Sequence, residues 1–172
     1  MKYQNCAVVA QASDETLDID AGLRLSDANI NPATGLATDD LNRFNEAVML
    51  LDMLSSCPEF RSDFLAWQPM SYREHFRASH SKTRNLAIAA YETADPNVRN
   101  LDTLAVTMTV VLEATRAAMT ADLKPVTIAA LADNAVNWLK PLIARAGSII
   151  NGEEEVTDAP SPQAVVDKLM KR

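Results

Sequence analysis

Four side chains in the middle of the chain have the types and the spacing of a cationic binding surface: Arg73, Arg77, His80 and Arg84. On one continuous helix, at about 100° per residue, they fall within about 60° of one another. Three arginines on one stripe repel each other, and the planar guanidinium group suits carboxylate or phosphate. The spacing therefore predicts a binding site for an anion or an acidic partner, unless acids of the same chain neutralise this basic stripe.

Charge is distributed unevenly along the chain, which has 172 residues and a net charge of −7. Residues 1–70 carry 4 basic and 11 acidic side chains, whereas residues 71–150 carry 9 basic and 7 acidic ones. The acidic total argues against nucleic-acid binding, which needs lysine and arginine to neutralise phosphate. The acidic part also offers the stripe an internal partner, through Asp40, Glu46 or the N-terminal segment, so an internal and an external partner both stay open.

Apolar residues at three- and four-residue steps predict an all-α protein, an antiparallel helical bundle of four to six helices with extended N-terminal and C-terminal arms. Capping residues and prolines predict helix starts near Thr38, Pro58, Ser71, Asp95 and Pro125. Gly152 is a typical residue to follow the last helix. We therefore expect a helical bundle over residues 38–152, an N-terminal arm over residues 1–37, and an acidic linker with a short amphipathic tail helix over residues 153–172.

The helix that carries the stripe is expected to begin with a capping box, because Glu74 follows Ser71 by three residues. It is expected to run to about Thr93 unless Ser79 and Ser81, which are weak helix formers, break it. Nearby aromatic side chains are interpreted as core at helical spacing, in preference to a stacking surface for a ligand; they are Trp67, Tyr72 and Phe76.

Two other segments have consequences for the architecture. Apolar residues alternate on both sides of residues 20–22, which suits a short hairpin or an irregular arm. The helix expected after Asp95 has two adjacent apolar stripes, and such a helix is typically surrounded by neighbours, so we expect it at the bundle centre. Glu113 lies on the second stripe and is expected at the helix edge. The first stripe is Leu101, Leu104, Met108, Val111, Leu112 and Met119, and the second is Val106, Val110, Ala114 and Ala117.

Residues for other chemistry are scarce. The two histidines, His75 and His80, lie about 140° apart on a helix, which does not suit the i,i+4 ligand pairs of zinc helices. With four glycines, the chain has neither a dinucleotide-binding loop nor a Walker loop. We therefore assign no catalytic residue, no metal and no cofactor, and a non-enzymatic protein is favoured over an enzyme.

One short segment resembles the phosphorylated region of histidine phosphotransfer domains, which are acidic helical bundles with an exposed histidine and a lysine close behind it: Ala78-Ser79-His80-Ser81-Lys82-Thr83. The resemblance covers half a dozen residues and implies phosphotransfer at His80. The leucine and the glycine that follow the histidine in that family are missing here. A histidine phosphotransfer-like bundle is therefore the remotest of the functional alternatives.

The predicted function is that of a non-enzymatic helical interaction or adaptor protein, which binds a protein partner or associates with itself. The alternative is a helical protein or enzyme that holds a small anionic ligand on the basic stripe. A pocket around the stripe would favour the ligand, and a flat surface would favour the adaptor. No apolar run approaches the roughly 18 residues of a membrane span, and the first residues have no secretory signal pattern, so we expect a cytoplasmic protein.

Overall fold

The computed structural model describes residues 20–94 and 97–153. Residues 1–19 of the predicted N-terminal arm, and residues 154–172 with nearly all of the predicted linker and tail helix, lie outside the described residues. In the described part every regular element is a helix, and its one bridge between extended residues is isolated, which confirms the all-α class. No helix in these ranges is long and apolar enough to cross a membrane.

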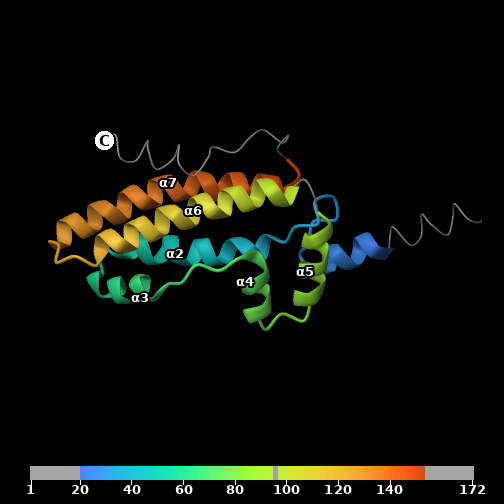
Figure 1. The fold of residues 1–172 in the computed structure, drawn as a ribbon, viewed down its shortest axis with the longest axis horizontal. Coiled ribbons are helices and arrows are strands. Elements are labelled where there is room, and N and C mark those ends of the chain that lie inside the picture. The colour runs from blue at the N-terminus through green and yellow to red at the C-terminus, as the bar shows by residue number, and fades with distance from the viewer. Residues whose placement is uncertain (1–19, 95–96, 154–172) are drawn as a thin grey trace, which may run out of the picture.

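The helices form two long layers and one projecting hairpin. A helix over residues 20–27 comes first. It is followed by η1 (Thr38–Leu41), α2 (Asn42–Met53), η2 (Pro58–Phe60), α3 (Arg61–Ala66), α4 (Tyr72–Ala78), α5 (Arg84–Thr93), α6 (Asn97–Met119) and α7 (Pro125–Asn151). Figure 1 shows α6 and α7 antiparallel and side by side, with α2 and α3 packed beneath them. α4 and α5 form a helical hairpin that projects beyond α2 on the side away from α7 (Figure 1).

The core lies where α6 and α7 face α2. Three fully buried side chains of α6, Leu104, Met108 and Leu112, recur at four-residue steps. α6 packs along α7, whose Leu139 is also fully buried. Phe44 of α2 is buried beneath them. Burying a side chain of this size stabilises the fold by about 1.5–3 kcal/mol, so the two long helices and α2 are the frame on which the hairpin is mounted.

Among the described residues, no helix covers the second apolar stripe of α6. Val106 is 52% exposed, and Ala114 and Ala117 are exposed as well. The expected position of α6 at the bundle centre is therefore wrong. The two stripes face in different directions, and only the one through Leu104 and Met108 is packed between α7 and the layer of α2 and α3. The uncovered stripe leaves apolar surface on one side of α6.

The segment before η1 contains a helix, where the sequence had left a short hairpin or an irregular arm open. Residues 20–27 form a helix, and residues 28–37 form a turn closed by the isolated bridge between Ile30 and Ala37. Ile30 is buried, and the hydroxyl of buried Thr34 donates to the carbonyl oxygen of Ile150 at 2.6 Å. The described part of the predicted arm is therefore packed against the end of α7. The sequence does not indicate this helix by an apolar period, because the helix packs against the core through one large side chain, that of Leu25, which is itself only half-buried.

Candidate functional site

The predicted basic stripe is divided, because two helices, α4 and α5, replace the single helix expected over residues 71–93. α4 ends at Ala78. The next residue, Ser79, has an extended backbone with ψ of 150°, and its hydroxyl donates to the carbonyl oxygen of Phe76 at 2.9 Å. The Ser81 hydroxyl then accepts a hydrogen bond from the backbone of Thr83 at 3.2 Å, at the entry to α5. Serine and threonine side chains compete in this way with helical hydrogen bonds. The prediction of one continuous helix face is therefore wrong.

Arg73 has an internal partner across the hairpin. Its Nε atom lies 3.4 Å from Oε1 of Glu92 on α5, and its guanidinium group lies 5.6 Å from the ring centroid of Tyr91. Both members of the ion pair are about half exposed, so the pair contributes at most about 1 kcal/mol. The internal partner is thus Glu92 rather than the expected Asp40 or Glu46, and Arg73 belongs to the contact between α4 and α5.

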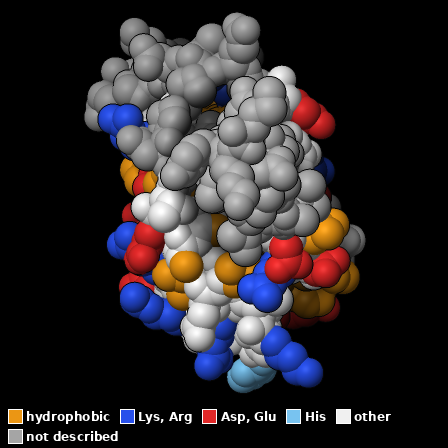
Figure 2. Space-filling model, turned by 90° about the vertical axis from the view of Figure 1, so that its right-hand side faces the viewer, with side chains coloured by type: hydrophobic (Ala, Val, Ile, Leu, Met, Phe, Trp, Pro, Cys, Tyr) orange, Lys and Arg blue, Asp and Glu red, His pale blue; other side chains and the backbone are white. Residues whose placement is uncertain are grey.

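The other basic side chains gather where α4 and α5 are joined. We call Arg77, His80, Lys82 and Arg84 the basic tip. All four are exposed, and no aspartate or glutamate occurs between residues 75 and 91. Arg84 also lies against the loop, since its Nη1 atom donates to the carbonyl oxygen of Ser79 at 3.4 Å. Figure 2 shows Lys, Arg and His side chains at the lower end of the molecule, where Figure 1 places the loop between α4 and α5.

The predicted capping box is confirmed and fixes the start of the hairpin. The Ser71 backbone N–H donates to Oε2 of Glu74 at 2.8 Å, and the Glu74 backbone N–H donates to the Ser71 hydroxyl oxygen at 3.3 Å. The hydrogen bonds from the Ser71 backbone and hydroxyl hold the pKa of the Glu74 carboxyl below its ordinary value of 4.5. The ionised carboxylate of Glu74 is therefore favoured in the folded protein.

Replacing Glu74 by glutamine should produce a stability loss that depends on pH. Because the folded pKa lies below the unfolded one, the carboxylate contributes fully above the unfolded pKa, and its contribution is lost as the pH falls through the folded pKa. Urea denaturation should therefore show the variant less stable than the wild type at pH 7, and the difference should shrink at acidic pH, as the pH falls through the folded pKa. The control is Glu59→Gln, which replaces an exposed glutamate on η2. A loss that is equal at both pH values would contradict the role of the ionised box.

A buried ion pair lies behind the start of α4. Asp40 and Arg43 are 0% and 4% exposed, and two hydrogen bonds of 3.0 Å join the guanidinium group to the two carboxylate oxygens. Arg43 also donates to the carbonyl oxygen of Met70, and its own carbonyl accepts from Nε1 of Trp67 at 3.2 Å. The pair therefore ties the connector between α3 and α4 to α2. Sequence reasoning missed Arg43, because the three-residue spacing from Asp40 indicates a pair but not its burial.

The aromatic residues near the hairpin are core, as expected. Trp67, Tyr72 and Phe76 are buried, and the ring of Tyr72 stacks on that of Tyr91 with centroids 4.2 Å apart. The Tyr72 hydroxyl oxygen accepts from the backbone of Ala37 at 3.1 Å. Burial raises the pKa of Tyr72 and of Tyr91 well above the ordinary value, so both phenols stay protonated at neutral pH. These rings join α4 to α5 and to the segment before η1.

A cleft of about 540 Å³ separates the start of α4 from α6. We call it the acidic cleft, because three carboxylates line it, those of Glu74, Asp102 and Glu113, while its one cation, Arg43, is already paired. Asp102 accepts hydrogen bonds from the Tyr91 hydroxyl at 2.7 and 2.8 Å. Glu113 is exposed, which confirms its expected place at the helix edge. The apolar lining consists mainly of Pro69, Met70, Ala105, Val106 and Val110.

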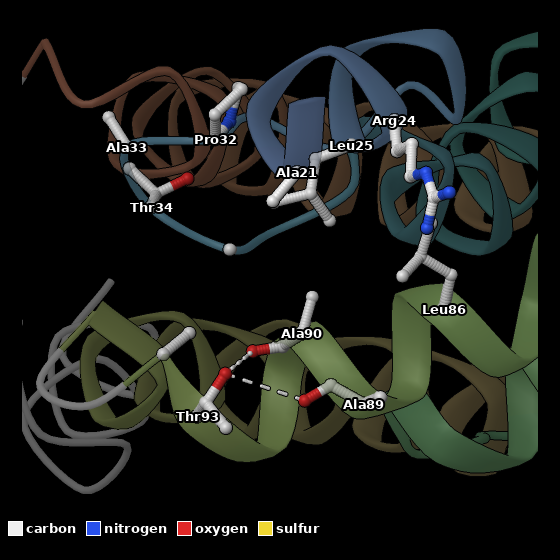
Figure 3. Close-up of a pocket in the computed structure, with 12 residues that line it drawn as sticks. Ala21, Arg24, Leu25, Pro32, Ala33, Thr34, Leu86, Ala89, Ala90 and Thr93 are labelled. Atoms are coloured by element: carbon white, nitrogen blue, oxygen red, sulfur yellow. Dashed lines mark hydrogen bonds between the residues drawn. The ribbon is translucent and has the colours of Figure 1, made fainter. Parts of the chain in front are cut away.

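Two further cavities have fewer charged residues in their lining. The α5 groove, of about 550 Å³, lies between α5 and the segment of residues 21–35, and Figure 3 shows the Arg24 side chain reaching across it toward Leu86. Arg24 is the only charged residue that lines this groove. The α6–α7 groove, of about 380 Å³, has no charged lining residue and includes Trp138. These three cavities differ mainly in charge, and only the acidic cleft combines carboxylates with apolar surface.

Other kinds of site find no support in the described residues. No group of three or more His, Cys, Asp or Glu side chains within residues 20–94 and 97–153 is arranged to hold a metal ion. Comparison with family models, with curated proteins and with solved structures gives no match to this chain. The features that bear on function are therefore the chain's own: the basic tip, the acidic cleft and the uncovered apolar stripe of α6.

Proposed function

We propose that this protein is a non-enzymatic interaction protein that binds an acidic segment of a partner protein through its basic tip. The observation that carries the proposal is the basic tip itself. Arg77, His80, Lys82 and Arg84 are exposed at the end of a projecting helical hairpin, and the 17 residues from 75 to 91 include no acidic side chain. A cationic surface of this kind suits carboxylates presented by an extended acidic segment.

The shape of the tip favours a macromolecular partner over a small anionic ligand. Small ligands are generally bound in concave sites that bury most of their surface. The three cavities of the protein described above are lined by other residues, and none of them includes a member of the basic tip. A convex, charged end contacts a partner from outside, as charged rims of protein interfaces do.

The charge of the whole chain adds selectivity. At a net charge of −7, the body of the protein repels an acidic partner, and the attraction is confined to the end of the hairpin. Electrostatic complementarity mainly raises the association rate and is screened by salt over a Debye length of about 8 Å at physiological ionic strength. Binding should therefore be fast, weak to moderate in affinity, and strongly dependent on salt.

Charge reversal at the tip tests the proposal. With a fluorescein-labelled oligoglutamate peptide as the probe, fluorescence anisotropy at low salt should show saturable binding to the wild type. The double variant Arg77→Glu/Lys82→Glu should bind at least about tenfold more weakly, because two attractive contacts become repulsive. The matched control is Lys124→Glu/Lys140→Glu, which makes the same change in net charge at two exposed positions, one directly before α7 and one within it, and should weaken binding much less.

The same titration separates the alternatives. Equal weakening by both double variants would mean that only net charge matters and would overturn a site at the tip. Absence of binding to the wild type would also overturn it. Saturable binding of inorganic phosphate, abolished by Arg77→Glu/Lys82→Glu in a calorimetric titration, would support the small-ligand alternative instead.

A further inference from the structure

The acidic cleft combines two features that call for a cationic, amphipathic occupant. Its apolar lining includes Val106 of α6, which is 52% exposed although the α6 residues Leu104 and Met108 on either side of it are fully buried. Its lining includes the carboxylates of Glu74, Asp102 and Glu113, whereas its one cation, Arg43, forms an ion pair with Asp40. An apolar side chain in this cleft would cover Val106, and basic groups beside it would meet three carboxylates.

The sequence beyond Gly152 contains a segment of that chemistry. Apolar residues follow a helical pattern, with Val165, Val166, Leu169 and Met170 within about 140° at 100° per residue. Three basic residues, Lys168, Lys171 and Arg172, fall on the adjoining part of the same helix, and the segment has one acid, Asp167. Twelve residues are too few for a stable isolated helix in water, so such a segment gains its order from a surface on which it packs.

We propose that residues 161–172 dock as an amphipathic helix in the acidic cleft of the same chain. The lengths agree, since twelve helical residues span about 18 Å and the α6 residues from Asp102 to Glu113 span about 16 Å. Leu169 and its apolar neighbours lie on the surface around Val106, and the basic residues lie against the carboxylates. The docked segment covers the part of the second α6 stripe that borders the cleft.

The linker is long enough for this path. The position where a Cβ atom would stand on Gly152 lies 3.3 Å from Thr34. Gly35, the residue after Thr34, lies against Ala90 of α5 and against Ala94, which follows α5. Tyr91, which follows Ala90, lines the near end of the acidic cleft. The eight residues 153–160 span up to about 26 Å when extended. The path from Gly152 to the cleft therefore runs past Thr34, Gly35 and Ala90, which neighbour one another in turn.

The charges of the cavities and of the terminal segments favour the basic tail segment as the occupant of the acidic cleft. The α5 groove carries the cation Arg24, and the α6–α7 groove has no charged lining, so neither complements a basic helix. The segment before residue 20 is acidic, with Asp14, Glu15 and Asp18 against Lys2, and does not suit three carboxylates. Of the three cavities described above, the acidic cleft is therefore the one whose charge complements the basic tail segment.

Hydrogen exchange on the full chain tests the docking. Amides of residues 163–172 should exchange at least about tenfold more slowly in the protein than in a synthetic peptide of residues 153–172, and at a rate independent of protein concentration. Val106→Glu, a change at a half-exposed position, should return them to the peptide's rate. Val126→Glu, at a position that is 72% exposed on the far end of α7, should leave the protection intact.

Reversing one charge in the cleft and one in the tail segment tests the same contact a second time. Glu113→Lys and Lys168→Glu should each raise the exchange rate of the tail amides several-fold, and the two together should restore much of the protection. Exchange at the peptide's rate in the wild type overturns the proposal, and so does protection that Val106→Glu does not affect. Protection that grows with protein concentration assigns the segment to a second copy and overturns the intramolecular form. None of these variants touches the basic tip, so the outcome is independent of its partner.

Discussion

Asp40→Asn should lower the free energy of unfolding by about 3–5 kcal/mol, because it leaves the buried cation of Arg43 without its counter-ion. The guanidinium group is 4% exposed and is held by the carboxylate through two hydrogen bonds of 3.0 Å. An asparagine side chain offers one acceptor oxygen and no charge. Arg43 then cannot move to water without breaking its bond to Met70 and its stacking over Phe44, 4.2 Å from the ring centroid.

Urea denaturation of Asp40→Asn measures this loss, and a second ion pair provides the control. Asp20 and Arg24 are also a local pair on one helix, but their side chains are 67% and 76% exposed. Asp20→Asn should therefore change stability by no more than about 0.5 kcal/mol. Removing both buried charges, in Asp40→Leu/Arg43→Met, should recover part of the loss, since no unpaired charge remains. A loss below about 1 kcal/mol for Asp40→Asn would show that water reaches Arg43.

The long helices were predictable because their signals are local. α7 begins at Pro125 and is followed by Gly152 with φ of 72°, as its proline and glycine indicate. The capping box at Ser71 and Glu74 also forms as its spacing predicts. In each case the residues that specify the element lie within one turn of its end, so a single sequence contains the necessary information.

The break within residues 71–93 was less predictable, because it depends on whether the chain gains more from a continuous helix or from a turn that lets α4 pack against α5. Ser79 and Ser81 are weak helix formers, but they occur inside many helices, and only the packing of α4 against α5 favours the turn. That packing joins Tyr72 to Tyr91, nineteen positions later, and Arg73 to Glu92. The predicted stripe failed for the same reason, since an angle on a helical wheel holds only while the helix continues.

The two candidate sites also differ in whether their residues are close together in the sequence. The basic tip could be found in part from the sequence, because its members are close together in the chain and no acid lies among them. The acidic cleft could not, because Glu74, Asp102 and Glu113 come from two separate helices. Its exposed Val106 was misinterpreted as core, since periodicity identifies an apolar stripe but not whether a neighbour covers it.

Gly35→Ala should destabilise the protein by about 2–4 kcal/mol, the sum of a left-handed backbone cost and an overpacking cost. Gly35 has φ of 69°, a conformation that residues with a Cβ atom rarely adopt. An added Cβ would stand 3.1 Å from the carbonyl oxygen of Ala90 on α5 and 2.8 Å from the Cβ atom of Ala94, which directly follows α5. Neither neighbour is a flexible side chain that can rotate away, so the turn or the helix must shift.

Gly152→Ala separates the two causes. Gly152 also has a positive φ, 72°, but an added Cβ would stand 3.3 Å from a methyl group of Thr34 and would meet no backbone. Its replacement should cost only about 1 kcal/mol, the backbone part alone. If the two alanine variants lose equal stability in urea denaturation, the close approach of the turn to α5 contributes nothing. If Gly35→Ala loses about 1–3 kcal/mol more, the turn presses on α5 and fixes the base of the hairpin that carries the basic tip. Both Arg77→Glu and Gly35→Ala should then weaken binding of the oligoglutamate peptide. Arg77→Glu does so by reversing a charge at the tip, without a loss of stability. Gly35→Ala does so by displacing the hairpin, and it should also lower the free energy of unfolding.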